Sequence, residues 1–374
     1  PICPDGGREA WLCVAGCAAL YFCSYGWLNS IGVTQEYYRR VPLSSLPATT
    51  VSWIGALETF FLPFCSPFVG ILFDRMGPTI PLLIGMFLHV FGLMMLSLST
   101  KYYQIILTQG VCSAIGMSFV FNPAATSVSM WFQRRRPLAN AIAASGAPIG
   151  GIIFPIIANR LIPTLGFGWT MRVSAFVILA LMLFALATVK IPTKPVPKSF
   201  NRAIAKRALQ PAFLSLVTSF FLFSFGAFLP LIYITEIAVK GGLSVGMSQY
   251  LVCILNAGGL VGRMSSGLLG QPLGMFNVSA VVAMLCSIIL LAIWIPATGT
   301  AGAIVFAVAF GFAFNFVVAA TAVLVSQVSE FQELGLRVGI VWGTSSIGAI
   351  AGILVGSSLI TGNDYVRLKI FSGV

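Results

Sequence analysis

From Met264 to Ser329 the chain contains no charged residue. A helix that crosses a bilayer needs about 20 apolar residues, so this stretch has room for more than two such helices. Only turn-forming residues interrupt it, at Gln271-Pro272-Leu273-Gly274 and at Pro296-Ala297-Thr298-Gly299. The stretch therefore predicts consecutive membrane-spanning helices.

The composition extends this interpretation to the whole chain. Of its 374 residues, 58% are hydrophobic and 8% are charged, whereas a soluble domain carries about 25% charged residues. So few charges cannot cover the surface of a water-soluble fold. This excludes a soluble enzyme, a nucleic-acid-binding protein and a disordered chain.

The apolar stretches predict an all-α membrane protein. They cover residues 10–33, 50–73, 80–98, 103–130, 138–158, 169–189, 211–235, 247–269, 278–295, 302–328 and 338–360. A further apolar segment begins at Tyr365 and stops at Val374. We therefore expect eleven complete transmembrane helices and a truncated twelfth.

The longest polar interval, residues 190–210, divides these stretches. It is rich in Lys, Arg and Pro and contains no acidic residue. The expected organisation is an N-terminal six-helix half (1–189), a basic linker (190–210) and a C-terminal half (211–374) with helices 7–11 and the start of helix 12. Two such halves are typical of transporters with a site between them.

The basic residues predict an orientation. The net charge of +12 comes from short clusters between apolar stretches, as in loops that face an anionic leaflet. The densest clusters, Arg134-Arg135-Arg136 and the linker, place the N-terminus and the linker in the cytoplasm. We expect the plasma membrane to be the location.

A weak internal repeat supports the two halves. The segments Gly70–Gly77 and Gly267–Gly274 both have the spacing GxxxxxxG at the end of the second helix of their half. The sequence has no nucleotide-binding fingerprint, HExxH motif or CxxC pair, so we expect no cofactor, no metal and no enzymatic activity.

Several segments together resemble a known family. GILFDRMG (70–77) resembles the GxxxDRxG loop of the major facilitator superfamily. PDGG (4–7), AWL (10–12) and WFQRRRPLANAIAASGAPIGG (131–151) resemble the monocarboxylate transporter family, and GVTQEYY (32–38) and ILNAGGLVGR (254–263) resemble its fungal branch. The resemblance implies a twelve-helix facilitator fold with alternating access. It also implies a small organic acid as cargo, often with a proton, although fungal members also carry neutral compounds or secondary metabolites.

The sequence departs from this family at two positions. Acid-transporting animal members keep a lysine late in helix 1, where this chain has Asn29, and an aspartate four residues before the arginine of helix 8. Here Arg263 is present, but Gly259 occupies the aspartate position. Two of the three charges that the family uses for protons and carboxylates are absent, which favours a neutral or amphipathic cargo.

Ionisable residues within membrane helices are candidate functional residues, because burying them is costly. Arg263 is the candidate counter-charge for a carboxylate, since a guanidinium can donate two parallel hydrogen bonds; the alternative is a structural brace. Glu58 is the candidate proton-coupling residue, and the alternative is a hydrogen bond to a neighbouring helix. We expect His89 to be packed and neutral.

Uncharged polar residues and one loop complete the candidate set. The amides Asn29, Asn122, Asn256 and Asn315 lie within apolar stretches and are candidates for substrate binding or for hydrogen bonds between helices. In the facilitator fold that the resemblance implies, Asp74 and Arg75 are expected to form a conformational latch rather than a binding site.

The leading functional prediction is a secondary active transporter of a small organic acid, monocarboxylate-like, with a proton as candidate coupling ion. The alternatives are a permease or exporter of a neutral or amphipathic metabolite, such as a secondary metabolite or a vitamin-like compound, and a membrane sensor of the same fold that does not transport. The expected partners are an organic anion, the lipid bilayer and a proton, without nucleic acid.

Overall fold

The computed structural model describes residues 5–192, 210–297, 299–360 and 365–374, and these contain helices and no strand. In chain order the helices are α1 (Arg8–Tyr21), η1 (Phe22–Gly26), α2 (Ile31–Arg40), α3 (Ala48–Phe64), α4 (Ser66–Met76), α5 (Thr79–Leu96), α6 (Tyr102–Ile105), η2 (Ile106–Ser113), α7 (Ala114–Trp131), α8 (Arg136–Ala144), α9 (Gly146–Thr188), α11 (Pro211–Ala227), α12 (Leu229–Lys240), α13 (Val245–Leu273), α14 (Met275–Ile288), η3 (Ile289–Trp294), α15 (Gly299–Gln327), η4 (Phe331–Glu333), α16 (Leu334–Ser358) and α17 (Val366–Gly373). The expected all-α membrane fold is confirmed.

Ten helical stretches of the described residues are long and apolar enough to cross a membrane, and the longest, Arg136–Thr188, has 53 residues, enough for two crossings. Its break is at Gly166, which has φ 78° and ψ 165°, a backbone conformation that glycine adopts at little cost. Both limbs lie along the first helix, because Gly26 packs against Gly150 while the Cys23 thiol donates to the carbonyl of Ile178. The interruption expected between the apolar stretches 138–158 and 169–189 is therefore present, but it is shorter than expected, because the helices on both sides extend to Gly166.

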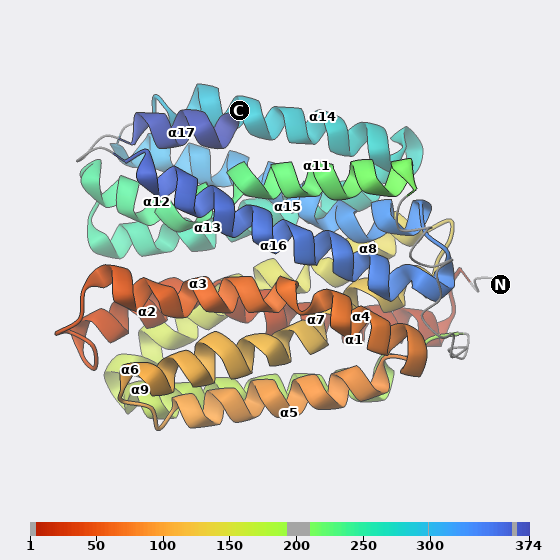
Figure 1. Cartoon of the computed structure of the whole chain (residues 1–374), viewed down its shortest axis with the longest axis horizontal. Helices are drawn as coiled ribbons and strands as arrows, with labels where there is room; N and C mark the ends of the chain where they lie inside the picture. The colour runs from red at the N-terminus through yellow and green to blue at the C-terminus, as the bar shows by residue number, and fades with distance from the viewer. Residues whose placement is uncertain (1–4, 193–209, 298, 361–364) are drawn as a thin grey trace.

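The helices form two bundles that lie side by side. Figure 1 shows α1 to α9 in one bundle and α11 to α17 in the other. The division of the chain at a linker stays a prediction, because residues 193–209 lie outside the described part. The short α17 begins at Val366, close to the expected start of the truncated helix.

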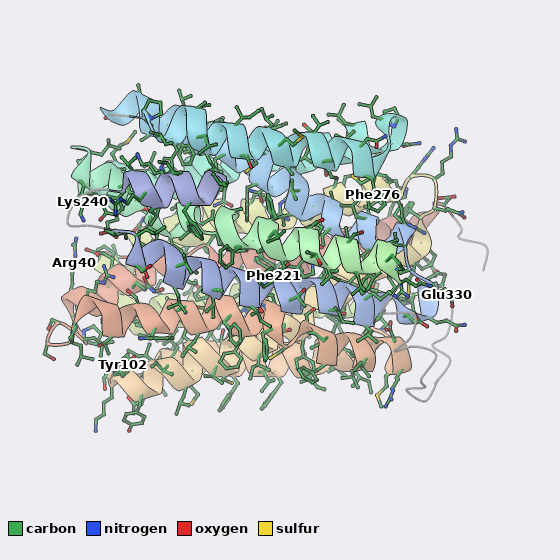
Figure 2. The ribbon with its side chains drawn as sticks, turned by 45° about the horizontal axis from the view of Figure 1, so that its top comes forward. Arg40, Tyr102, Phe221, Lys240, Phe276 and Glu330 are labelled. Carbon is green, nitrogen blue, oxygen red and sulfur yellow. The ribbon has the colours of Figure 1, made fainter. Side chains whose placement is uncertain are left out.

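The outer surface of the bundles is apolar. Phe68, Phe87 and Met284 are about two-thirds exposed, as side chains that face lipid would be. Figure 2 shows the labelled charged residues at the ends of the helices, with Arg40 and Lys240 at one end and Glu330 at the other. The side chains of the long helices thus separate into an apolar belt and two polar ends.

Irregular backbone marks two helices of the N-terminal bundle. The first transmembrane helix passes from α1 through the π-helical segment η1 and is interrupted by a turn at Asn29 and Ser30 before α2. The fourth contains the π-helical segment η2. Such segments mark places where a helix can adjust its hydrogen bonds.

The two bundles pack closely at the end that carries Asp74, which we call the Asp74 end. A Cβ atom added to Gly70 would clash with the backbone of Gly335, and one added to Gly267 would reach the backbone of Leu138. Small residues allow helices to approach this closely. The first glycine of each repeated GxxxxxxG segment is therefore a contact point between the bundles.

Candidate functional site

Aromatic rings meet at the centre of the interface between the bundles. Tyr25 and Phe121, from η1 and α7, both lie against Trp342 of α16, with ring centroids 5.8 Å and 5.2 Å from the indole. Tyr25 and Phe121 are themselves 4.9 Å apart. These rings join the N-terminal bundle to the C-terminal bundle.

A narrow cavity adjoins this aromatic cluster. It is lined by Tyr25, Thr59, Pro63, Phe228, Trp342, Ser345, Ser346 and Ala349. The space that side chains leave open would admit about one water molecule. The bundles are thus closed around their shared centre in this conformation.

Arg263 lies buried beside this centre and connects the two bundles. Its Nε donates to the Asn315 side-chain oxygen at 2.9 Å, within its own bundle, and its NH1 group donates to the carbonyl of Ala144 in the other bundle at 2.8 Å. The side chain is 5% exposed. Among the described residues, no carboxylate lies within ion-pair distance of Arg263, so the buried guanidinium is held by neutral acceptors.

Asn315 occupies the space above Gly259. A Cβ atom at Gly259 would clash with the Asn315 amide, which also donates to the carbonyl of Gly311 at 3.1 Å. The Asn315 amide of α15 thus lies over Gly259, the position at which acid-transporting members of the monocarboxylate transporter family have an aspartate. The sequence identified both residues but not their contact, because they lie on different helices.

Asn29 and Asn256 also approach each other from the two bundles. A Cβ atom on Gly151 would lie 2.8 Å from the amide of each. Both amides donate to a carbonyl one turn earlier in their own helix, of Tyr25 and Val252 respectively, at 2.9 Å. The structure brings these two candidates together, and their binding of substrate stays a prediction.

Asn122 lies apart from this pair, near the Asp74 end. Its amide nitrogen donates to the Ser66 hydroxyl at 2.9 Å and to the carbonyl of Gly335 in the other bundle at 3.2 Å. Its side-chain oxygen is buried and has no hydrogen-bond partner in the described part of the chain. The amide therefore takes part in the contact between α7, α4 and α16.

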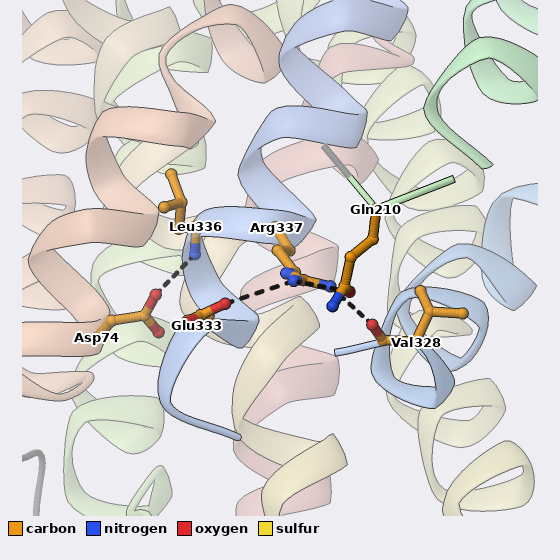
Figure 3. A network of polar contacts seen from close by, with 6 residues as sticks. All are labelled: Asp74, Gln210, Val328, Glu333, Leu336 and Arg337. Carbon is orange, nitrogen blue, oxygen red and sulfur yellow. Dashed lines mark hydrogen bonds and ion pairs between the residues drawn. The ribbon is translucent and has the colours of Figure 1, made fainter. Parts of the chain in front are cut away.

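The carboxylate of Asp74 binds the beginning of α16. Figure 3 shows it beside Leu336, next to a second network around Arg337. Asp74 accepts hydrogen bonds from the backbone N–H groups of Gly335 and Leu336 at 2.9 and 2.8 Å. Arg337 pairs with Glu333 at 3.4 Å and donates to the carbonyl of Val328 at 2.7 Å. The side chain of Arg75, by contrast, is exposed.

Glu58 is the centre of a buried polar network in the N-terminal bundle. Its two oxygens accept hydrogen bonds from the Trp27 indole at 3.2 Å and from the Gln109 amide at 2.7 Å. The Gln109 oxygen accepts from the Tyr38 hydroxyl at 2.6 Å. The sequence singled out the acid but not its partners, since Trp27, Tyr38 and Gln109 have no pattern that distinguishes them from packing residues.

His89 is fully buried, and both ring nitrogens have partners. Nδ1 is 2.9 Å from the Ser113 hydroxyl and Nε2 is 3.1 Å from the carbonyl of Cys23. The carbonyl can only accept, so Nε2 carries the hydrogen and Nδ1 accepts from Ser113. No group of three His, Cys, Asp or Glu side chains suited to a metal ion occurs among the described residues.

The comparisons with known proteins point to one superfamily of transporters. Residues 11–353 match the family profile described as Major Facilitator Superfamily. The "MFS transporter asaE" of Aspergillus flavus is 41% identical over 99% of this chain and 85% of the relative. The "Fujikurins efflux protein" of Gibberella fujikuroi is 43% identical over 99% and 81%, and the "Agnestins efflux protein AgnL12" of Paecilomyces divaricatus is 34% identical over 98% and 84%.

Two solved structures have the same fold. The Escherichia coli fucose:proton symporter FucP superposes with a TM-score of 0.77 over 98% of this chain and 96% of the symporter, at 15% identity. The human organic anion transporter MFSD10 gives the same TM-score over 98% of each chain, at 14% identity. The relatives are named as transporters, two of them as efflux proteins, and none of the three is named as a monocarboxylate carrier.

Proposed function

The chain belongs to the major facilitator superfamily, and from this premise we propose that it exports an amphipathic small metabolite by alternating access between its two bundles. Two of the relatives described above are named as efflux proteins, one for fujikurins and one for agnestins. This favours the alternative functional prediction over the leading one, a small monocarboxylate.

The chemistry of the central interface supports an amphipathic cargo, and this observation carries the proposal. The rings of Tyr25, Phe121 and Trp342 offer an apolar wall, and Arg263 lies buried nearby without a described carboxylate. Aromatic walls with a few placed polar groups are typical of small-molecule sites. A compound with an apolar body and one acidic group would satisfy both features.

Alternating access requires this closed centre to open. In our proposal the two bundles separate at the Asp74 end to admit cargo, and the hydrogen bonds of Asp74 to α16 re-form when that end closes. Asp74 then acts as a latch that stabilises one of two access states. The exposed Arg75 contributes through its charge near the membrane surface rather than through a contact.

The direction of export follows from the expected orientation. The excess of basic residues at the N-terminal and linker side favours placing the Asp74 end in the cytoplasm. Cargo would then enter from the cytoplasm and leave at the end that carries Arg40 and Lys240. We propose the plasma membrane as the location.

The proposal is tested by transport into inside-out plasma-membrane vesicles from a fungal host that expresses the protein. The probes are an aromatic carboxylic acid with an apolar side chain, its neutral methyl ester, and lactate. We expect concentrative uptake of the aromatic acid and none of lactate above vesicles without the protein. Uptake of lactate alone would overturn the proposed cargo class in favour of the monocarboxylate prediction.

A further inference from the structure

Glu58 is a buried acid whose hydrogen bonds come from neutral groups. Its side chain is fully buried on α3, and the described donors are the Trp27 indole and the Gln109 amide. No Lys or Arg of the described chain pairs with it. A carboxylate in this position lacks the counter-charge that normally offsets burial.

Three hydrogen bonds of this network point toward the carboxylate, and a longer one, at 3.5 Å, runs from the Gln109 amide to the Thr34 hydroxyl. The Tyr38 hydroxyl donates to Gln109, the Gln109 amide donates to one oxygen of Glu58, and Trp27 donates to the other. This arrangement suits an ionised acid, which only accepts. A proton on either oxygen would face a donor, and only Gln109 can resolve this conflict, by reversing its amide.

The network spans the two irregular helices. Trp27 directly follows η1, Tyr38 lies on α2 beyond the interruption at Asn29 and Ser30, and Gln109 lies within η2. Glu58 therefore connects the segments before and after the break in the first helix to the π-helical segment of the fourth. A change in this network acts on backbone that is already able to shift.

The other titratable groups near Glu58 either belong to its network or have partners elsewhere. Glu58 is therefore the group of this network that we expect to change charge. From α2 the network contains Tyr38, and Arg40 of α2 pairs with Glu36 in an exposed position at 2.7 Å. From η2, Cys112 donates to the carbonyl of Leu88. From α5, His89 lies beyond Trp27, with ring centroids 6.4 Å apart, and both its nitrogens are occupied.

We propose that Glu58 is a proton-binding site that is loaded and unloaded once in each transport cycle, with Gln109 as the element that reverses. In the loaded state the Glu58 O–H donates to the Gln109 oxygen, and the Gln109 amide donates to the Tyr38 oxygen. Both contacts keep their partners and reverse their direction, and the Tyr38 hydroxyl hydrogen loses the acceptor that it has now, which alters the link between α2 and the network. The proton comes from water on one side of the membrane and returns to water on the other. This inference rests on the proposed function, to which it adds the driving force.

Proton binding is measured directly by infrared spectroscopy of the purified protein in lipid nanodiscs, without cargo. As the pH falls, we expect the wild type to show a protonated-carboxyl band that belongs to Glu58. Glu58→Gln should abolish this band. The matched control Glu36→Gln, which changes a half-buried acid of α2 that pairs with Arg40, should leave it intact. A wild-type spectrum without the band, or the same band in Glu58→Gln, would overturn the proposal.

The conformational role is measured in the same samples. Spin labels at Met76 and Gln332, on either side of the Asp74 end, report whether that end is open. We expect the open fraction to depend on pH more steeply in the wild type and in Glu58→Asp than in Glu58→Gln, where the Asp74 carboxylate at that end still titrates. In Gln109→Leu the carboxyl band should persist, while the dependence of the open fraction on pH falls to that of Glu58→Gln.

An open fraction that depends on pH as steeply in a folded Glu58→Gln variant as in the wild type would contradict the coupling. Because Glu58→Asp keeps the acid, it separates loss of the proton site from loss of folding. All these measurements need no cargo, so their failure leaves the proposed export function standing, and failure of the export assay leaves the proton site standing.

Discussion

The carboxylate of Asp74 accepts the backbone N–H of Leu336 at 2.8 Å, although the two residues lie 262 positions apart in the chain. The N–H groups at the beginning of a helix have no partner within the helix, and the helix dipole makes this end positive. An acid from α4 therefore satisfies the beginning of α16 in the other bundle. In the proposed transport cycle this contact is lost when the Asp74 end opens.

The first prediction concerns this contact. Asp74→Ala removes both hydrogen bonds, and bonds to charged groups contribute about 1.5–3 kcal/mol. We expect the ratio of open to closed molecules to rise by about ten- to a hundredfold. Spin labels at Met76 and Gln332 would measure this as a longer distance in most molecules.

The control for this prediction is the neighbouring Arg75. Its side chain is exposed, so Arg75→Ala should change the distance distribution little. If Arg75→Ala opens that end as much as Asp74→Ala does, the charge of the loop matters rather than the hydrogen bonds.

The second prediction concerns the glycines at the contact points. Gly70→Val should open the Asp74 end, because the added atoms would clash with the backbone of Gly335, and Gly267→Val should do the same at Leu138. Overpacking costs about 1–3 kcal/mol. Gly32→Val is the control, since a Cβ atom at Gly32 meets nothing within 4 Å. Unchanged label distances in both interface variants would show that these glycines do not hold the closed state.

Hydropathy was sufficient to predict the helices but not their breaks. The apolar stretches and the charged turns follow directly from the cost of burying charges in lipid, so the spans could be placed from sequence. The break at Gly166 could not be restricted to one residue, because polar and turn-forming residues surround it at the membrane surface. The π-helical segments have no signature in composition.

The candidate site was predictable in its ionisable residues and not in its contacts. Arg263, Glu58 and Asp74 stand out because charges are rare in apolar stretches. Asn122 has the same appearance in the sequence as Asn256, yet it contacts α16 near the Asp74 end while Asn256 lies opposite Asn29. Which helix a polar side chain faces depends on packing between segments far apart in the chain, and a single sequence does not contain that information.

The third prediction concerns pH and the segment before α1. Asp5 accepts hydrogen bonds from the backbone N–H groups of Gln133 and Arg134 at 2.6 and 2.9 Å. Partial desolvation of the Asp5 carboxyl acts to raise its pKa, but these hydrogen bonds outweigh it and hold the pKa below its usual value. A lowered pKa means that the contact stabilises the folded state above about pH 4 and is lost as the pH falls through the lower folded value.

Amide hydrogen exchange at residues 133–134 tests this pH dependence. At neutral pH, Asp5→Asn should exchange faster than the wild type, and the difference between the two should shrink below about pH 4. Glu9→Gln, which alters an exposed acid at the beginning of α1, is the control and should match the wild type throughout. A difference that persists at low pH would show that the carboxylate charge is not responsible.

The last prediction tests the proposed anion site by adding a negative charge beside Arg263 as well as by removing the charge of Arg263. Asn315→Asp would give Arg263 a carboxylate partner at the position where Nε now donates to an amide at 2.9 Å. The internal ion pair should compete with an acidic cargo and weaken its binding about ten- to a hundredfold, while the neutral methyl ester binds as before.

Arg263→Gln should likewise weaken binding of the acid and leave binding of the methyl ester unchanged. Arg263→Lys should weaken binding of the acid less, because lysine keeps the charge but lacks the planar guanidinium that donates two parallel hydrogen bonds. The amount of protein at the cell surface must be measured together with transport. Arg263 also donates to the carbonyl of Ala144 in the other bundle, so its loss could affect folding. If Asn315→Asp and Arg263→Gln both reach the membrane and bind the acid with wild-type affinity, Arg263 is a brace between the bundles. The acidic group of the cargo is then recognised elsewhere.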